Sequence, residues 1–216
     1  VEYLPNFHKF PQRYYLDFAS KYAARHAEAI IAVSAATKRD LVNRYGIDSK
    51  KIFVVHEGVD RTIFKRVNDK EIAKIKKKYK IKGDFLLFVR TIQPRKNLEF
   101  LIETFSKLSL KVKDLDLVIV GKSGWDYEPI YAAPKKFGVA GKVKFIGRVG
   151  DLELPALYSA AKAFVFPSLI EGFGLPLLEA MACKCPVIAS DIGSHREIVR
   201  KPDSDKLEAG ILVKGF

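Results

Sequence analysis

Short apolar runs alternate with helix-like segments over most of this 216-residue sequence, and this alternation constrains the fold more than any other feature. The runs are continuous, as expected of strands that helices cover on both faces. Regular alternation of this kind predicts an α/β fold, a doubly wound parallel sheet with right-handed crossovers. The predicted strands span residues 85–90, 115–121, 143–147, 163–167, 186–190 and 210–213. The predicted helices between them span residues 98–110, 127–137, 152–161, 177–184 and 194–200.

The first 60 residues carry a shorter stretch of the same alternation. It predicts a helix over 12–29, a strand over 29–33, a helix over 35–45 that Gly46 ends, and a strand over 52–55. Gly58-Val59-Asp60 then breaks the pattern, and a polar, lysine-rich segment follows. We therefore divide the chain into a piece of one domain (1–60), an interdomain connection (61–83) and a second domain (84–216).

The net charge of +13 indicates an anionic partner. Much of the excess lies in residues 65–82, where Ile72, Ile75 and Tyr79 recur at helical spacing among lysines, which is typical of a solvated amphipathic helix. The sequence shows no helix-turn-helix, zinc-finger or aromatic RNA-binding pattern, so we expect no nucleic-acid partner. Attraction to anionic lipid headgroups or to phosphorylated substrates is the better use of the charge.

The cysteines and the apolar runs indicate a cellular setting. Cys183 and Cys185 lie too close together for a disulfide framework and lack further ligands at zinc-like spacing, so we interpret them as buried thiols of a cytoplasmic protein. No apolar run approaches about 18 residues and no signal peptide is visible, so we expect at most a peripheral contact with the inner face of the membrane. Because the sequence starts at Val1, we expect it to be part of a longer product.

The segment from Ser168 to Ala182 predicts a binding site for an anion. A strand ends near Pro167, a loop bracketed by Gly172 and Gly174 follows, and a helix opens at Pro176. Proline suits the first helical turn because its missing N–H would have no partner there. The free amides of the loop and the positive end of the helix then point to one place, which suits a diphosphate.

Two carboxylates flank this site, Glu171 in the loop and Glu179 in the helix. A carboxylate beside a phosphate repels it, so these two side chains more plausibly accept hydrogen bonds from sugar hydroxyls. A diphosphate with a sugar at each end is a nucleotide-sugar. The spacing therefore predicts a nucleotide-sugar site.

Basic residues at the ends of predicted strands support this interpretation. In a doubly wound sheet ligands bind outside the carboxyl ends of the strands, where Arg90, Gly121, Arg148 and Ser168 lie. Lys96 enters the next helix, where positive charge is mildly unfavourable unless an anion lies nearby. We expect Arg90 and Lys96 to reach the diphosphate and to stabilise a departing nucleotide.

Several other nucleotide and hydrolase motifs are excluded. Gly121-Lys122-Ser123 resembles the end of a P-loop, but Asp116 stands where that motif requires glycine. No G-x-G-x-x-G follows the first strand of either part, which argues against nicotinamide or flavin binding. The sequence has no G-x-S-x-G nucleophile elbow, and its four histidines are scattered rather than clustered around a metal.

Taken together, these segments resemble the group 1 retaining glycosyltransferases of the GT-B fold, which include bacterial mannosyltransferases and glycogen synthases. The resemblance covers nearly the whole chain. Glu171 and Glu179 around Gly-Phe-Gly-Leu-Pro match the family's E-x7-E motif, and residues 91–97 match its phosphate-binding segment. Further matching blocks are Gly58-Val59-Asp60, Gly121-Lys122-Ser123-Gly124-Trp125, Phe145-Ile146-Gly147-Arg148-Val149 and Pro186-Val187-Ile188-Ala189-Ser190.

The resemblance implies a Rossmann-like donor-binding domain that follows the tail end of a second Rossmann-like domain. It implies that Glu171, Lys96 and Arg90 act at the reacting centre, Glu171 on the donor sugar and the two cations on the diphosphate. Glu179 would hold the ribose hydroxyls. The other donor-binding residues that it implies are Gly172, Phe173, Gly174, Leu175, Arg148, Val149, Gly121 and Ser168.

The implied reaction is transfer of a hexose, mannose or glucose, from a nucleoside-diphosphate sugar to a glycan or lipid-linked acceptor, with retention at the anomeric carbon. The nucleotide-sugar is a substrate, and neither a cofactor nor a metal is expected. A sugar phosphorylase or nucleotide-sugar epimerase of the same fold is an alternative. A non-enzymatic basic module that docks on membranes or nucleic acid is another.

Three departures from the family pattern matter. Arg90 stands where many relatives have glycine, and Lys184 stands at a usual glycine, where a left-handed backbone would cost lysine roughly 1 kcal/mol. Most of the family's N-terminal domain is absent, because residues 1–59 resemble only its last part. The helix that closes the family's C-terminal domain is absent as well.

Overall fold

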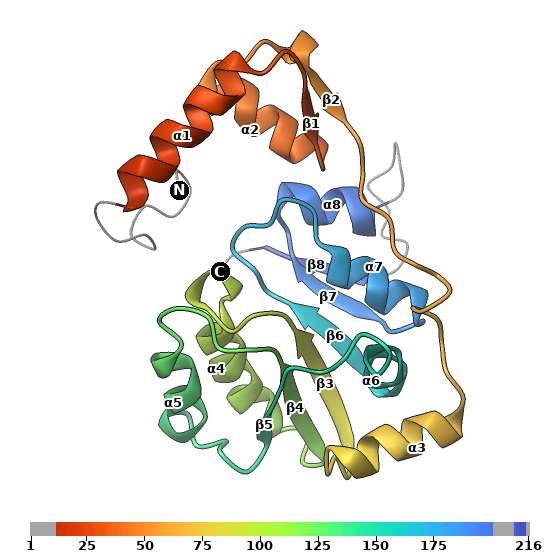
Figure 1. Ribbon diagram of the computed structural model, residues 1–216. Coiled ribbons are helices and arrows are strands. Elements are labelled where there is room, and N and C mark those ends of the chain that lie inside the picture. The colour runs from red at the N-terminus through yellow and green to blue at the C-terminus, as the bar shows by residue number, and fades with distance from the viewer. Residues whose placement is uncertain (1–11, 201–209, 215–216) are drawn as a thin grey trace.

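The computed structural model describes residues 12–200 and 210–214. They form a small region (residues 12–60) and a large region (residues 61–200 and 210–214), and the small region lies above the large one in Figure 1. The helices are α1 (Gln12–His26), α2 (Ala35–Tyr45), α3 (Asp69–Lys78), α4 (Leu98–Ser109), α5 (Glu128–Lys136), α6 (Leu154–Ala160), α7 (Leu175–Ala182) and α8 (Gly193–Val199). The strands are β1 (Ile30–Ala32), β2 (Ile52–Val54), β3 (Asp84–Val89), β4 (Leu115–Val120), β5 (Val143–Gly147), β6 (Ala163–Phe166), β7 (Val187–Ser190) and β8 (Gly210–Val213).

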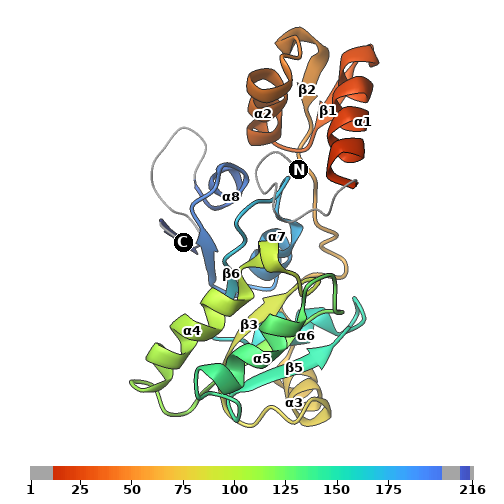
Figure 2. The same ribbon diagram turned by 90° about the vertical axis from the view of Figure 1, so that its left-hand side faces the viewer.

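The large region contains one parallel sheet of six strands in the order β5-β4-β3-β6-β7-β8. After β5 the chain crosses back and adds β6 on the free side of β3, so the order reverses between these two strands. Helices α4 and α5 pack together on one face, and α3, α6 and α7 form a row on the other (Figures 1 and 2). The predicted doubly wound, Rossmann-like sheet is confirmed, and its reversal point is where such sheets bind ligands.

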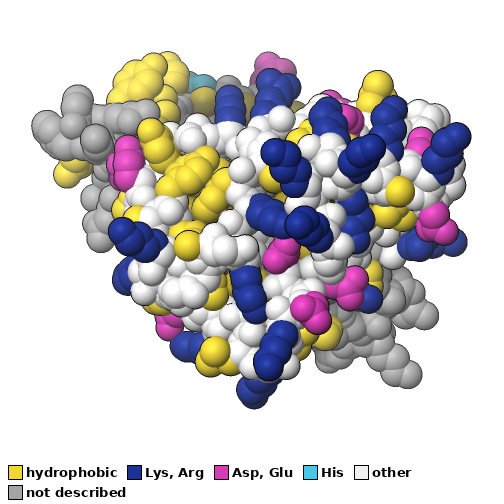
Figure 3. All heavy atoms as spheres, turned by 90° about the horizontal axis from the view of Figure 1, so that it is seen from below, with side chains coloured by type: hydrophobic (Ala, Val, Ile, Leu, Met, Phe, Trp, Pro, Cys, Tyr) yellow, Lys and Arg dark blue, Asp and Glu magenta, His cyan; other side chains and the backbone are white. Residues whose placement is uncertain are grey.

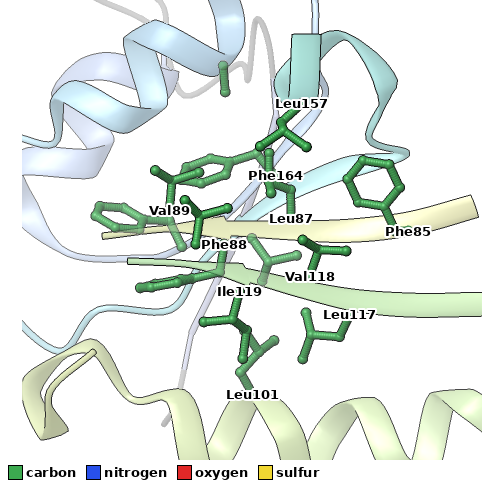
Figure 4. Packing of buried hydrophobic residues seen from close by; sticks show 14 of the residues in the cluster. Phe85, Leu87, Phe88, Val89, Leu101, Leu117, Val118, Ile119, Leu157 and Phe164 are labelled. Atoms are coloured by element: carbon green, nitrogen blue, oxygen red, sulfur yellow. The ribbon is translucent and has the colours of Figure 1, made fainter. Parts of the chain in front are cut away.

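The central strands are buried on both faces, which explains their continuous apolar sequences. Side chains of β3 and β4 that solvent does not reach are Phe85, Leu87, Phe88, Leu117, Val118 and Ile119. Figure 4 shows Leu101 of α4 against one side of these strands and Leu157 of α6, with Phe164 of β6, against the other. Each such side chain contributes about 1.5–3 kcal/mol of burial free energy, so the sheet is a rigid support for whatever its edges carry.

The small region is built on a two-stranded parallel sheet. Ile30, Ile31 and Ala32 of β1 pair with residues 52–54 of β2. Helix α2 begins after its N-cap Ser34 and ends at Gly46, whose φ of 66° is the left-handed conformation that favours glycine, as predicted. Only Ala32, Ile47 and Ile52 form a buried cluster among the described residues of this region.

A helix occupies part of the predicted connection between domains. Asn68 caps the start of α3 by accepting a hydrogen bond from the amide of Glu71 (3.0 Å). Ile75 of α3 is buried in the core of the large region, where α3 packs against α6, and the amide of Val67 donates to Ser159 in α6 (3.1 Å). The lysine-rich segment is therefore packed on the large sheet's helices rather than extended between the regions.

Three details of the sequence prediction are revised or resolved. Helix α1 ends at His26 rather than at residue 29, and the Nδ1 atom of His26 lies 2.8 Å from the carbonyl oxygen of Tyr22 in the last turn. Helix α7 starts at Leu175, one residue before Pro176, which still lies in the first turn. Lys184 has a φ of 58°, so the left-handed conformation anticipated at this position is present.

Candidate functional site

The predicted site segments meet at the carboxyl edge of the large sheet. Arg90 follows β3, Gly121 follows β4, Arg148 follows β5 and Ser168 lies two residues after β6. Because all six strands are parallel, these residues share one edge, the edge that lies toward the small region in Figure 1.

An ion pair between Lys96 and Glu171 forms the centre of this site. Lys96 ends a short 3₁₀ turn (Pro94–Lys96), and only 2% of its side chain is exposed. Its ammonium donates to Glu171 Oε1, while Arg95 Nη1 lies 3.2 Å from Glu171 Oε2 and also 3.2 Å from the carbonyl oxygen of Ile170. The structure therefore brings the predicted phosphate-binding lysine and the predicted sugar-binding carboxylate into direct contact.

Burial and charge set the protonation of this pair. Burial lowers the pKa of Lys96 from its ordinary value of 10.5 to about 8, although the carboxylate of Glu171 acts in the opposite direction. Burial alone would raise the pKa of Glu171, but the charges of Lys96 and Arg95 outweigh it and hold that pKa below its ordinary value. Both groups are therefore mainly charged at neutral pH, with Lys96 closer to losing its proton than a surface lysine.

Glu179 lies in α7 in a different polar environment. Its Oε2 accepts a hydrogen bond of 2.8 Å from the hydroxyl of Tyr158, which is fully buried. Burial raises the pKa of Glu179, while the Tyr158 hydrogen bond and the charge of Arg90 act against that rise. The charge of Arg90 acts on Lys96 as well, so this arginine lies within electrostatic range of both halves of the site.

The loop before α7 leaves the positive end of that helix uncapped by side chains. Gly174, the N-cap residue, has a φ of 125°, and its cap makes no side-chain hydrogen bond within the described residues. A Cβ atom at this position would lie 3.3 Å from Cδ2 of His195 and 3.4 Å from Leu177. The backbone conformation therefore favours glycine, and the space for a side chain is tight. The amides from Gly172 to Leu175 are the predicted anion-binding groups.

A pocket of about 310 Å³ lies between the ends of β3, β4 and β5. Three of the predicted donor-binding residues, Gly121, Arg148 and Val149, line it together with Arg90, which was predicted to act at the reacting centre. Gly121 has a φ of 156°, and a Cβ there would approach the carbonyl oxygen of Arg90 to 1.8 Å. The backbones of these strand ends therefore touch, which forms the floor of the pocket.

Ser168 does not line that pocket. Its side chain is buried, and its carbonyl oxygen accepts a hydrogen bond of 2.5 Å from Ser190 Oγ at the end of β7. Phe173 is also largely buried, stacked against His56 of the small region with ring centroids 5.6 Å apart. A second pocket, of about 270 Å³, opens beside Glu171 between α2 and the start of α8.

Comparison with known proteins decides the family. Residues 68–215 match the family described as "Glycosyl transferases group 1". The chain belongs to this family. Residues 2–62 of this glycosyltransferase chain match "Glycosyltransferase Family 4", so the two regions carry two different family matches.

Similar proteins fall into the same group. The chain is 28% identical over 197 residues to O-antigen chain mannosyltransferase B of Escherichia coli, a match that covers 90% of this chain and 51% of that protein. It is 32% identical over 203 residues to D-inositol 3-phosphate glycosyltransferase of Salinispora tropica, covering 88% and 41%. The glycosyltransferase chain thus spans about half the length, or less, of these relatives.

Solved structures show the same fold. Anabaena HepE in complex with UDP and glucose has a TM-score of 0.77 at 24% identity, over 95% of this chain and 54% of that one. The C-terminal domain of LpcC, a group 1 glycosyl transferase from Francisella tularensis, is 31% identical with a TM-score of 0.61, over 73% and 80%. That structure contains only the C-terminal domain of its protein, and the large region of this glycosyltransferase corresponds to such a domain.

Sequence reasoning missed two buried polar residues of the site. Tyr158 lies in an apolar helical run, and nothing in its sequence context indicates that it donates to Glu179. His195 is fully buried, and its Nδ1 lies 3.0 Å from the carbonyl oxygen of Ser190, so Nδ1 carries the proton. Burial lowers the pKa of His195 to about 4, so its ring is neutral beneath the Gly174 loop.

The described residues offer no metal site of ordinary composition. Nowhere in residues 12–200 and 210–214 do three or more histidine, cysteine, aspartate or glutamate side chains group so that they could hold a metal ion. Cys183 and Cys185 are free and buried, as predicted, and burial raises the pKa of each thiol to about 12. Neither thiol is a reactive nucleophile or a ready ligand.

Proposed function

We propose that this protein transfers a hexose, mannose or glucose, from a nucleoside-diphosphate sugar to a glycan or lipid-linked acceptor, with retention at the anomeric carbon. The observation that carries the proposal is the contact between Lys96 and Glu171 beside the uncapped amino end of α7. A cation, a carboxylate and free amides at one sheet edge match a diphosphate joined to a sugar. Family membership and the mannosyltransferase relatives support the same reaction class.

The cations bind and stabilise the diphosphate. Lys96, Arg90 and the amides of residues 172–175 direct positive charge to the place where the leaving phosphate gains negative charge as the glycosidic bond breaks. A diphosphate next to Lys96 favours its protonated form, so donor binding strengthens the charge that the reaction needs. Because Glu171 already contacts Lys96, the hexose lies where its hydroxyls can donate to Glu171.

The nucleoside lies toward the pocket between β3, β4 and β5. Arg148 and Val149 line this pocket and bind near the base. Glu179 binds the ribose hydroxyls: a carboxylate has two oxygens with free lone pairs, so it can accept from Tyr158 and from the ribose at the same time. This division predicts that Glu179 governs nucleotide affinity and Glu171 governs transfer.

We further propose that transfer requires neither a metal nor another cofactor. Three groups, Lys96, Arg90 and the amino end of α7, already supply the positive charge that a divalent cation provides in other nucleotide-sugar enzymes. The expected result is full transfer activity in excess EDTA. An activity that EDTA abolishes and Mg²⁺ or Mn²⁺ restores would contradict this part of the proposal.

The basic surface supports a contact with an anionic membrane. Figure 3 shows Lys and Arg side chains spread over the face below the large sheet, and α3 alone contributes Lys70, Lys74, Lys76, Lys77 and Lys78. Residues 65–82 contain nine basic and two acidic residues. Among the described helices, none is long and apolar enough to cross a bilayer. We propose peripheral attraction of this face to anionic lipid, tested by salt-sensitive binding to phosphatidylglycerol vesicles and absence of binding to phosphatidylcholine vesicles.

The deciding experiment is a donor screen on the full-length protein. Calorimetric titration with GDP-mannose, UDP-glucose and ADP-glucose should show binding of at least one donor, and NMR of the product should show the anomeric configuration of that donor. A folded protein that binds none of the three contradicts the proposed function. Release of free sugar phosphate in the presence of phosphate, or appearance of an epimer, would instead indicate a phosphorylase or an epimerase.

A further inference from the structure

A carboxylate of the large region caps a helix of the small region. Glu197 lies in α8, yet its Oε2 accepts the amide of Ala35 and its Oε1 accepts the amide of Ala36, both at 2.8 Å. These are the first two amides of α2, which have no partner inside the helix. The third, from Thr37, donates to the N-cap hydroxyl of Ser34 at 3.0 Å. The first three amides of α2 therefore all have acceptors, and two of the three acceptors belong to Glu197 of the large region.

The same end of α2 holds the loop that carries Glu171. Ser34 Oγ donates to the carbonyl oxygen of Gly172 at 2.7 Å, and Thr37 Oγ1 lies 3.2 Å from the same oxygen. From the opposite side, Ser194 Oγ donates to the carbonyl oxygen of Glu171 at 3.1 Å. Two consecutive carbonyls of the acidic loop are thus held, one by each region.

Close packing and an aromatic contact complete the junction. A Cβ atom on Gly193 would lie 2.8 Å from Cβ of Ala36, so α8 and α2 are as near to one another as glycine allows. His56 Nε2 lies 3.2 Å from Glu197 Oε2, and the His56 ring stacks on Phe173. Glu197 is therefore the point at which α8, α2 and the segment after β2 meet, and only 17% of its side chain is exposed.

We propose that Glu197 is a positioning residue of the transfer site: by docking the amino end of α2, it places Ser34 and Thr37 on the Gly172 carbonyl and so fixes the Glu171 carboxylate beside Lys96. This inference rests on the proposed function, because it assigns Glu171 to the donor sugar. Arg90, Gly121 and Arg148 line a pocket that does not include α2, so the nucleoside part of the donor does not depend on this junction.

The test compares hexose transfer with binding of the free nucleoside in the full-length protein. Glu197→Ala should lower kcat about tenfold or more, because a carboxylate displaced by about 1 Å costs up to two orders of magnitude. The Kd for the free nucleoside should stay within about twofold of the wild type, because the nucleoside pocket includes neither α2 nor the loop amides that bind the diphosphate. Glu197→Gln should keep part of the activity, since its amide oxygen can still accept one of the two α2 amides. Glu103→Gln, on the outer face of α4, is the matched control and should change neither quantity.

Hydrogen exchange gives a readout that does not depend on activity. The amides of Ala35 and Ala36 should lose protection in Glu197→Ala and keep it in Glu103→Gln. Unchanged kcat in Glu197→Ala, or a loss of nucleoside affinity equal to the loss of kcat, overturns the proposal. If Glu197→Ala does not fold, Glu197→Gln and Gly193→Ala, whose new methyl group pushes against Ala36, make the same comparison. If the wild type transfers no hexose, the proposed function fails, and the exchange data alone decide whether Glu197 docks α2.

Discussion

The large region and the small region bury their apolar side chains to very different extents. The large region has a continuous cluster that runs from α3 to the end of α8, whereas the described part of the small region buries only Ala32, Ile47 and Ile52. Large apolar side chains of the small region are instead exposed: Tyr15 (71%), Phe18 (69%), Ile31 (71%) and Phe53 (57%). A two-stranded sheet of this kind is marginal by itself, so contacts made outside its own core matter more.

The difference in burial matches a difference in the roles that we propose for the two regions: the large region carries the reacting groups, and the small region helps to position them. The large region holds the Lys96–Glu171 pair on a rigid sheet edge, while the small region is joined to it largely through polar contacts at α2 and α8. A helix end held by a few hydrogen bonds can reposition at lower cost than a packed core, because each neutral bond contributes about 0.5–1.5 kcal/mol net and each bond to the Glu197 carboxylate about 1.5–3 kcal/mol.

Replacing Lys96 should abolish most of the activity. Lys96→Met should lower kcat by roughly 10²–10³-fold through loss of charge at the leaving phosphate. It should also lower the free energy of unfolding by about 1–3 kcal/mol, because the buried Glu171 loses one of its two cations and keeps only Arg95, whose side chain is 35% exposed. In the double variant Lys96→Met/Glu171→Gln the stability should return and the activity should not. Recovery of both would show that the pair is structural only. Steady-state kinetics and urea unfolding measure the two effects.

Equal truncations in the two regions should have unequal effects on stability. Phe88→Ala removes a fully buried ring and should cost about 3–5 kcal/mol of unfolding free energy. Phe18→Ala removes an exposed ring of α1 and should change stability by less than about 0.5 kcal/mol. Chemical denaturation of both variants makes the comparison. Similar losses in the two would mean that the exposed face of α1 is covered in the full-length protein.

Glu179→Ala should weaken nucleotide binding by about ten- to a hundredfold, since a hydrogen bond to a charged group contributes about 1.5–3 kcal/mol. Tyr158→Phe removes only the hydroxyl that Glu179 accepts, and should weaken binding less. Glu171→Ala should lower kcat while leaving the affinity for the free nucleoside diphosphate nearly unchanged. Calorimetry on the three variants measures the affinities. Equal, large losses of affinity in the Glu179 and Glu171 variants would refute the assigned roles.

The pKa of Lys96 predicts a loss of donor capture at alkaline pH. With a pKa of about 8 in the folded protein, Lys96 loses its charge as the pH rises through that value, so kcat/KM for the donor should fall above about pH 8. Because the folded pKa lies below the ordinary value of 10.5, the unfolded chain binds more protons in this window, and the Lys96 contribution to stability should rise from pH 8 to 10.5. Lys96→Arg should remove the pH 8 limb of the rate profile, whatever its absolute rate, because arginine stays charged.

Alkylation of the two cysteines tests whether the regions unfold separately, and it needs no substitution. Their pKa values of about 12 and their burial should prevent alkylation by iodoacetamide in the native protein. Both should react when the large region unfolds. Alkylation that starts at denaturant concentrations where only α1 and α2 have unfolded would show that the two regions are not energetically separate. Mass spectrometry of the labelled protein follows this directly.

Much of the large region could be predicted from local pattern. Continuous apolar runs set β3 to β8, and glycine and proline at positions 172, 174 and 176 set the loop and the start of α7, because backbone conformations at these positions depend on the residue itself. The family's usual glycine at position 184 raised the question of a left-handed conformation there, and the structure shows it for Lys184. The end of α1 was set three residues too late, in a stretch where alanines favour helix over any stop signal.

The sequence alone determined the alternation, the parallel sheet and the two acidic residues that bracket the α7 loop, because these follow from side-chain periodicity and from backbone preferences of single residues. Only the tertiary structure decided that Tyr158 donates a hydrogen bond to Glu179, 21 residues further along the chain. It also decided that Glu197 accepts the first amide of α2, 162 residues earlier in the chain. The fold of the sheet sets which backbones lie close together, and a buried carboxylate can accept a hydrogen bond from any donor placed within reach. No spacing in the chain records that choice.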